Sequence, residues 1–91
     1  MPPLIVANWK MQLDDATSVE TATRFVASCS GSCEVVLCAS FTALARVADV
    51  LRGSAVACGA QDCAPAARGA LTGEVSPADL AALGCRYVIV G

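Results

Sequence analysis

The chain of 91 residues is 56% hydrophobic and only 15% charged, with a formal net charge of −2 and no histidine. This length allows one compact domain and leaves little room for two. The hydrophobic excess excludes a disordered chain, and the slight negative charge with singly scattered arginines excludes a nucleic-acid-binding protein. Because so few polar residues cannot cover so small a globule, we expect protein outside this chain to cover part of its surface.

The sequence contains no membrane segment of the usual kind. No apolar run approaches the ~20 residues that a membrane span needs. Residues 1–7 lack the basic start and the long apolar stretch of a signal peptide. We therefore expect a cytoplasmic protein that does not contact a membrane.

The six cysteines could indicate disulfides or a metal site. Their spacings differ from the C-x2-C pairs of zinc sites, and no histidine can serve as a ligand. A cytoplasmic location would keep the thiols reduced. We therefore interpret them as small apolar residues, buried or partly buried, and expect no metal. These residues are Cys29, Cys33, Cys38, Cys58, Cys63 and Cys85.

The first half of the chain predicts two strands, each followed by a helix. Residues 4–9 form an apolar run rich in β-branched side chains, which predicts a buried strand. Residues 15–29 carry apolar side chains at helical spacing and predict a crossover helix. A second strand is predicted at 34–39, and Ser40 is placed to cap a helix that Gly53 stops.

The next segment contains a strand, a long connection and a third helix. The strand is predicted at 55–60. The connection at 61–75 is longer than most loops of compact domains, and loops of this length usually have a function. Ser76 then marks the N-terminus of a helix with proline in its first turn. Asp79 completes the spacing of a capping box, and Gly84 follows the end of the helix.

A fourth apolar run at 87–90 completes the order β-α-β-α-β-α-β. This alternation requires a parallel sheet with right-handed crossovers, so the predicted fold class is α/β.

Residues at the end of the first strand are candidates for a site, because ligands of parallel α/β folds gather where the strands end. A period of two points Asn8 and Lys10 to one side and Trp9 to the other. An amide beside an ammonium suits an anionic ligand such as a phosphate ester or an enediolate. The alternative is that Asn8 shapes a turn and Lys10 is a solvated charge; taken alone, the two residues favour this alternative.

No other catalytic signature is present. The sequence has no glycine-rich nucleotide-binding motif and no nucleophile elbow, and without histidine it has no Ser–His or Cys–His pair. Its acidic residues form no pair at a catalytic spacing.

Several segments resemble the first four strands of triosephosphate isomerase, and together they cover essentially the whole chain. The segments around Lys10 and Thr72 are the most specific. The matching segments are ANWKM at 7–11, VLC at 36–38 with FT at 41–42, GAQD at 59–62, GALTGEVSP at 69–77 and LGCRYVIVG at 83–91.

The resemblance implies a (β/α)8 barrel, of which residues 1–91 would be one incomplete domain. It also implies the interconversion of dihydroxyacetone phosphate and glyceraldehyde 3-phosphate in glycolysis and gluconeogenesis, without a cofactor, by a homodimer. Lys10 resembles the lysine that holds the substrate phosphate and stabilises the enediolate, and Asn8 resembles the substrate-contacting asparagine beside it. Thr72 resembles the tip of a loop that inserts near the active site of a second subunit, and Gly73 and Glu74 would hold the shape of that loop.

The sequence departs from the family pattern in three places. Gln12 stands where asparagine is usual, and Ala39 and Ser40 replace a pair of prolines. The sequence stops at Gly91, where the family continues into His-Ser-Glu-Arg. Triosephosphate isomerase is itself the standard example of a glutamate base that works beside a neutral histidine, and neither residue has a counterpart here.

We therefore expect this chain to supply substrate contacts and a dimer loop, but to be inactive alone. Its partner would be the remaining part of the barrel or a second subunit, and uncovered strand edges predict self-association or instability. The alternative is a small non-catalytic α/β module that binds an anion or a partner through Lys10 and residues 61–75.

Overall fold

The computed structural model describes residues 2–91 as one parallel sheet whose strands alternate with helices. The predicted order and the α/β class are confirmed, and no helix in residues 2–91 is both long and apolar enough to cross a membrane. The elements are β1 (Leu4–Asn8), α1 (Asp15–Ser28), β2 (Glu34–Ala39), α2 (Phe41–Leu51), β3 (Val56–Ala60), α3 (Pro77–Leu83) and β4 (Cys85–Val88).

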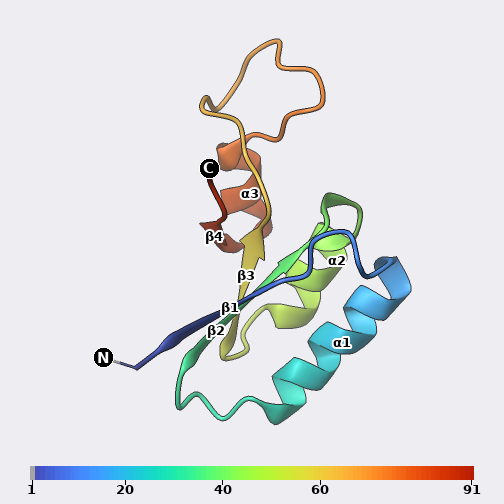
Figure 1. Ribbon diagram of the computed structural model, residues 1–91, viewed down its shortest axis with the longest axis vertical. Helices are drawn as coiled ribbons and strands as arrows, with labels where there is room; N and C mark the ends of the chain where they lie inside the picture. The colour runs from blue at the N-terminus through green and yellow to red at the C-terminus, as the bar shows by residue number, and fades with distance from the viewer. Residues whose placement is uncertain (1) are drawn as a thin grey trace.

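The four strands lie side by side in chain order, β1-β2-β3-β4, and each neighbouring pair is parallel. Leu4 of β1 pairs with Glu34 of β2, and Val35 of β2 pairs with Val56 of β3. Figure 1 shows α1 and α2 on the same side of the first three strands, with α3 beside β4. A parallel sheet in chain order with helices outside it is the arrangement of a barrel wall.

The core lies between the sheet and the helices. Leu37 of β2 and Leu44 and Val47 of α2 are fully buried there. Because successive strand residues point to opposite faces, Val36 and Cys38 point to the other face, which corresponds to the interior of a barrel. Both are also buried, so this second face is partly covered within the chain itself.

Gly59 makes room for a cross-sheet contact on this second face. A β-carbon at Gly59 would lie 2.7 Å from Cys38 Sγ and 2.9 Å from Val36 Cγ1, closer than real contacts allow. Tyr87 of β4 pairs with Gly59, and its hydroxyl donates to Glu34 Oε2 of β2 at 3.3 Å. The tyrosine side chain therefore links β4 to β2 across the position where β3 carries no side chain.

Two of the three helices begin with a side-chain cap. Asp14 accepts a hydrogen bond from the Thr17 N–H at 2.8 Å before α1, and this bond lowers the pKa of Asp14. Ser76 accepts from the Ala78 N–H at 3.2 Å before α3. Gly84 ends α3 in the left-handed conformation with φ 108°, as its position in the sequence predicted.

Two predicted caps are wrong in detail. Ser40 does precede α2, but its side chain makes no capping bond because its hydroxyl donates instead to the Lys10 carbonyl oxygen. Asp79 does not close a capping box; its carboxylate accepts a hydrogen bond from Arg68. The other half of the capping box is present, because the Asp79 N–H donates to Ser76 Oγ at 3.4 Å. The guanidinium gives the Asp79 carboxylate an opposite charge as well as a donor, which accounts for the choice.

The fourth strand differs most from its prediction at 87–90. It runs from Cys85 to Val88, because Gly84 ends α3 so sharply that the next residue already lies in the sheet. A register shift in the β3–β4 pairing then leaves Arg86 without a partner in β3. Such a bulge depends on tertiary pairing and leaves no periodic signal in the sequence.

Candidate functional site

Lys10 follows β1 at the edge of the sheet where β1, β2 and β3 all end. It is exposed and is the only lysine in the sequence. All four ion pairs formed within residues 2–91 use arginine. The Lys10 ammonium is thus a cation without a carboxylate partner in the described chain, at the edge where α/β folds bind ligands.

The backbone of Lys10 turns away from the strand. Its φ angle is 54°, and among residues 2–91 it is the one non-glycine residue with positive φ. This left-handed conformation costs an L-residue about 1–2 kcal/mol. Asn8 supports the turn, because its Oδ1 accepts a hydrogen bond from the Lys10 N–H at 3.0 Å.

Two further side chains hold the Lys10 carbonyl oxygen. Ser40, directly after β2, donates its hydroxyl to this oxygen at 3.1 Å. Gln61, directly after β3, donates from Nε2 at 2.9 Å to the same oxygen and at 2.9 Å to the Cys38 carbonyl oxygen. The ends of three neighbouring strands therefore meet at the backbone of Lys10.

These contacts modify the interpretation drawn from the sequence. The period-two argument does not extend to Lys10, because the extended backbone ends at Asn8. The expectation that Asn8 shapes a turn is confirmed, and the turn is the one that presents Lys10. Sequence reasoning missed Ser40 and Gln61 as part of this site; their signal was that each directly follows a strand that ends at the same edge of the sheet.

Hydrogen bonds join the two ends of the long connection after β3 and fix it to the start of α3. The Ala64 N–H donates to the Val75 carbonyl oxygen at 2.7 Å, which brings the two ends of the loop together. The Arg68 guanidinium donates to Ser76 Oγ at 2.9 Å and to Asp79 Oδ1 at 3.0 Å, which ties the loop to the start of α3. The loop is therefore an organised structure of its own.

The predicted dimer-loop residues Thr72, Gly73 and Glu74 are all exposed. The Glu74 N–H donates to the Leu71 carbonyl oxygen at 3.0 Å, and Gly73 supplies the positive φ of 85° that this turn needs. In Figure 1 the loop extends beyond α3, away from β1. Within residues 2–91, no hydrogen bond or ion pair joins residues 72–74 to Lys10.

Comparison with known proteins decides the family. The sequence model of triosephosphate isomerase matches residues 3–91. The triosephosphate isomerase of Gluconacetobacter diazotrophicus is 45% identical over 100% of this chain and 38% of its own length. That of Chloroflexus aurantiacus is 46% identical over 98% of this chain and 36% of its own. This chain belongs to the triosephosphate isomerase family.

The fold agrees with this assignment. The crystal structure of triosephosphate isomerase from Bartonella henselae superposes with a TM-score of 0.85 and 31% identity, over 100% of this chain and 38% of that one. The four strands are therefore part of a (β/α)8 barrel, as the resemblance predicted. The chain spans little more than a third of the length of the triosephosphate isomerases it matches.

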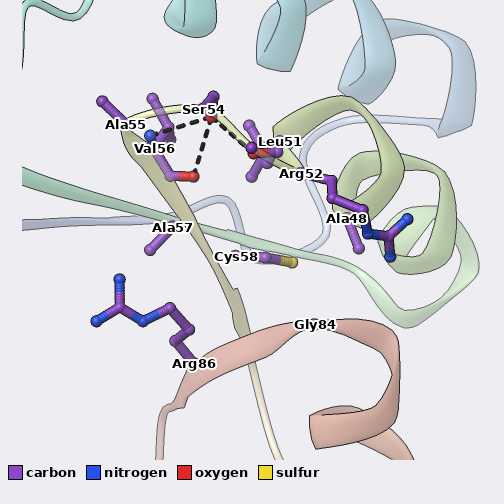
Figure 2. Close-up of a pocket in the computed structure, with 11 residues that line it drawn as sticks. Ala48, Leu51, Arg52, Ser54, Ala55, Val56, Ala57, Cys58, Gly84 and Arg86 are labelled. Carbon is purple, nitrogen blue, oxygen red and sulfur yellow. Dashed lines mark hydrogen bonds between the residues drawn. The ribbon is translucent and has the colours of Figure 1, made fainter.

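The cavity in Figure 2 lies at the opposite end of the sheet from Lys10. It has a volume of about 210 Å³ and is lined by the end of α2 and the starts of β3 and β4. The hydroxyl in its lining is hydrogen-bonded to the backbone: Ser54 Oγ donates to the Leu51 carbonyl oxygen at 2.7 Å and accepts from the Val56 N–H at 3.1 Å. Because triosephosphate isomerase barrels use the other end of their strands for chemistry, we interpret this cavity as structural.

The cysteines behave as core residues. All six are free thiols, with Cys38 and Cys58 buried and the others partly buried, as predicted. Cys58 Sγ lies 3.7 Å from Cys85 Sγ, and burial, followed by the proximity of the Cys85 thiol, raises the pKa of Cys58 to about 12. At neutral pH this thiol is protonated and a weak nucleophile, so it fits packing better than catalysis. No cluster of three or more metal-ligating side chains occurs within residues 2–91.

Proposed function

We propose that this chain supplies the substrate-binding lysine and asparagine of a triosephosphate isomerase. The whole enzyme would interconvert dihydroxyacetone phosphate and glyceraldehyde 3-phosphate, in the cytoplasm, as a step of glycolysis and gluconeogenesis. The observation that carries the proposal is that the Lys10 ammonium has no carboxylate partner among residues 2–91, while hydrogen bonds hold the Lys10 backbone at the edge where three strands end. Membership of the triosephosphate isomerase family is the reason to assign substrate binding to Lys10 and Asn8.

Lys10 would act through electrostatics. Its ammonium would pair with the phosphate of the substrate and would stabilise the negative charge that develops on oxygen as the enediolate forms. Asn8 already uses Oδ1 to accept from the Lys10 N–H, so its Nδ2 group is the part that can donate to a substrate oxygen. The Lys10 backbone and the Asn8 side chain would be held by hydrogen bonds before the substrate arrives, which lowers the cost of reorganisation.

The chemical steps need further groups. Proton abstraction beside a carbonyl requires a general base within hydrogen-bond reach, and these residues hold no histidine and no carboxylate paired with Lys10. We therefore propose that the 91 residues do not turn over substrate by themselves. The base and the electrophile would come from other polypeptide that completes the barrel.

The loop at Thr72, Gly73 and Glu74 would contact a second subunit. It is exposed, organised by its own hydrogen bonds and directed away from the strands that hold Lys10. A loop shaped in advance loses little entropy when it docks, which favours association. We propose a homodimer in which this loop forms part of the interface.

A hybrid polypeptide tests the role of Lys10. Residues 1–91 are joined to the part of the Gluconacetobacter diazotrophicus relative that follows the match, and isomerisation of dihydroxyacetone phosphate is measured. We expect activity, and we expect Lys10→Ala to lower kcat/KM by about 100-fold or more, because preorganised charge at a developing oxyanion contributes this much.

The matched control is Arg24→Ala, which removes an exposed positive charge on α1 whose ion-pair partner among residues 2–91 is Glu20. The hybrid should keep its activity in this variant. Equal losses in the two variants would contradict a specific role for Lys10, and measurable turnover by residues 1–91 alone would contradict the proposal that the base lies elsewhere.

A non-catalytic binding or assembly module is the second candidate, favoured by the loop that is organised within the chain itself. It predicts that residues 1–91 form a folded monomer whose Asn8 and Lys10 amide signals shift with inorganic phosphate. A folded but inactive hybrid together with these shifts would favour the module over the isomerase.

A further inference from the structure

We propose that Ser40 and Gln61 are positioning residues that aim the Lys10 ammonium by fixing its backbone. This inference rests on the proposed function, because it assigns to Lys10 the contact with the substrate. It adds two residues that do not themselves touch the substrate, and it explains how a flexible side chain can be directed from its base.

The hydrogen bonds of Lys10 fix both of its backbone torsions. The bond from the Lys10 N–H to Asn8 Oδ1, 3.0 Å long, constrains the peptide before Lys10 and so its φ. The bonds from Ser40 Oγ at 3.1 Å and Gln61 Nε2 at 2.9 Å constrain the direction of the Lys10 carbonyl and so its ψ. Since a left-handed backbone is unfavourable for lysine, it persists only when its surroundings enforce it.

Gln61 also ties this arrangement to the sheet. Its Nε2 donates both hydrogens, one to the Lys10 carbonyl oxygen and one to the Cys38 carbonyl oxygen at the end of β2, at 2.9 Å each. Cys38 is buried, so its carbonyl is a fixed reference point. A carbonyl oxygen has two acceptor sites, and Ser40 and Gln61 together fill those of Lys10. Rotation of the Lys10 peptide would break both bonds at once.

The direction of the Lys10 side chain follows from these bonds. Rotation about the N–Cα bond turns the Cα–Cβ bond relative to the preceding peptide, so a left-handed φ directs the Lys10 side chain differently from an extended φ. If the bonds from Ser40 and Gln61 are lost, Lys10 can relax toward the extended form, and its side chain then leaves the backbone in another direction relative to Asn8.

The variants for the test change single hydrogen bonds. Gln61→Glu keeps the shape of the side chain but replaces the Nε2 donor by a carboxylate oxygen, which repels both carbonyl oxygens. Ser40→Ala removes one donor, and Ser40→Thr keeps the hydroxyl. The matched control is Gln12→Glu, which adds the same charge two residues from Lys10, on an exposed side chain.

Two signals are measured by NMR on the hybrid polypeptide. The first is the intensity of the nuclear Overhauser cross-peak between the amide hydrogen and the α-hydrogen of Lys10. These two hydrogens are closest, and the cross-peak is strong, when φ is positive. The second is the affinity for glycerol 3-phosphate, a phosphate ester that cannot isomerise. We expect Gln61→Glu to weaken the cross-peak and to reduce the affinity about three- to tenfold. Ser40→Ala should show a smaller effect, and Ser40→Thr and Gln12→Glu should resemble the unchanged chain.

The outcomes separate the two proposals. A Lys10 cross-peak that stays strong in both Gln61→Glu and Ser40→Ala would overturn the positioning role. If Lys10→Ala leaves the affinity for glycerol 3-phosphate unchanged, the proposed function fails, and the cross-peak alone then decides the positioning role. Unchanged amide signals in β2 and β3 show that a variant is folded.

Catalysis by the hybrid polypeptide gives a second measurement. Gln61→Glu should lower kcat/KM about three- to tenfold and Ser40→Ala should lower it less, while Ser40→Thr should resemble the unchanged hybrid. Full activity in both of the damaging variants would overturn the proposal.

Discussion

Lys10 combines a free charge with a backbone conformation that its own side chain disfavours. Its left-handed φ of 54° is maintained by bonds from residues 2, 30 and 51 positions away in sequence. Strain of this kind persists where the surrounding structure over-determines it, and it is concentrated at functional sites. At the scale of one residue, the left-handed turn lowers the stability of the fold and sets the direction of the Lys10 side chain.

Replacing Lys10 by glycine should therefore separate stability from binding. Lys10→Gly relieves about 1–2 kcal/mol of strain and adds about 0.5–1 kcal/mol of backbone entropy cost, so we expect a gain of up to about 1.5 kcal/mol in the free energy of unfolding. Lys10→Ala should give no gain, since alanine keeps the β-carbon. Urea denaturation of both variants measures the difference, and equal stability of the two would argue against backbone strain at Lys10.

The buried thiol of Cys58 predicts a loss of stability in alkali. Burial, with a smaller effect of Cys85, raises the pKa of Cys58 from 9.0 to about 12. Below pH 9 the thiol is neutral in both the folded and the unfolded chain, so burial of the neutral thiol contributes fully to the free energy of unfolding. This contribution is lost as the pH rises through the pKa of the folded chain. Between these values unfolding becomes easier by at most about 1.4 kcal/mol per pH unit.

Urea denaturation of the unchanged chain and of Cys58→Ala, each at about pH 8 and pH 10, measures this effect. The alanine variant is expected to be less stable at both values but to lose less between them. The same decline in both chains would mean that another group titrates.

At the scale of the elements, local signals predicted the helices well and tertiary contacts decided the rest. Ser76 and Gly84 mark the two ends of α3 through bonds to residues within one turn, so the sequence could reveal them. The start of β4 at Cys85 depends on a bulge against β3, and the bonds from Ser40 and Gln61 to Lys10 join separate strand ends. Such contacts exist only once the sheet has formed, and no sequence spacing announces them.

The cap of α3 is predicted to stabilise the loop as well as the helix. Ser76 Oγ accepts from the Ala78 N–H and from Arg68, and it donates to the Ala67 carbonyl oxygen at 2.6 Å. Ser76→Ala should lower the free energy of unfolding by about 1 kcal/mol and should speed amide exchange at residues 65–74. Thermal denaturation and hydrogen exchange measure the two effects. Ser30→Ala, at an exposed position between α1 and β2, is the control. An equal change in that variant would contradict a stabilising role for the Ser76 cap.

At the scale of the whole molecule, the sheet has two unpaired edges among the described residues, β1 and β4. Leu4, Ile5 and Val6 of β1 are each about half exposed, at 49%, 51% and 48%. A flat apolar edge pairs readily with another chain. The same features suit a segment that is covered by further strands in a complete barrel.

Residues 1–91 alone should therefore self-associate. We expect light scattering to show a mass that grows with concentration, and Ile5→Lys to reduce it, because a charge on an edge strand opposes pairing. Met11→Lys is the control, since Met11 is exposed but lies outside the strand. A concentration-independent monomer with cooperative melting would count against open edges.

The lone ε-amine also offers a practical handle on the entire chain. Because Lys10 is the single lysine and every ion pair in residues 2–91 belongs to an arginine, amine-selective reductive methylation with a ¹³C label would place one side-chain reporter at the edge of the sheet. Its resonance would follow ligand arrival, assembly with further polypeptide and unfolding in a single spectrum.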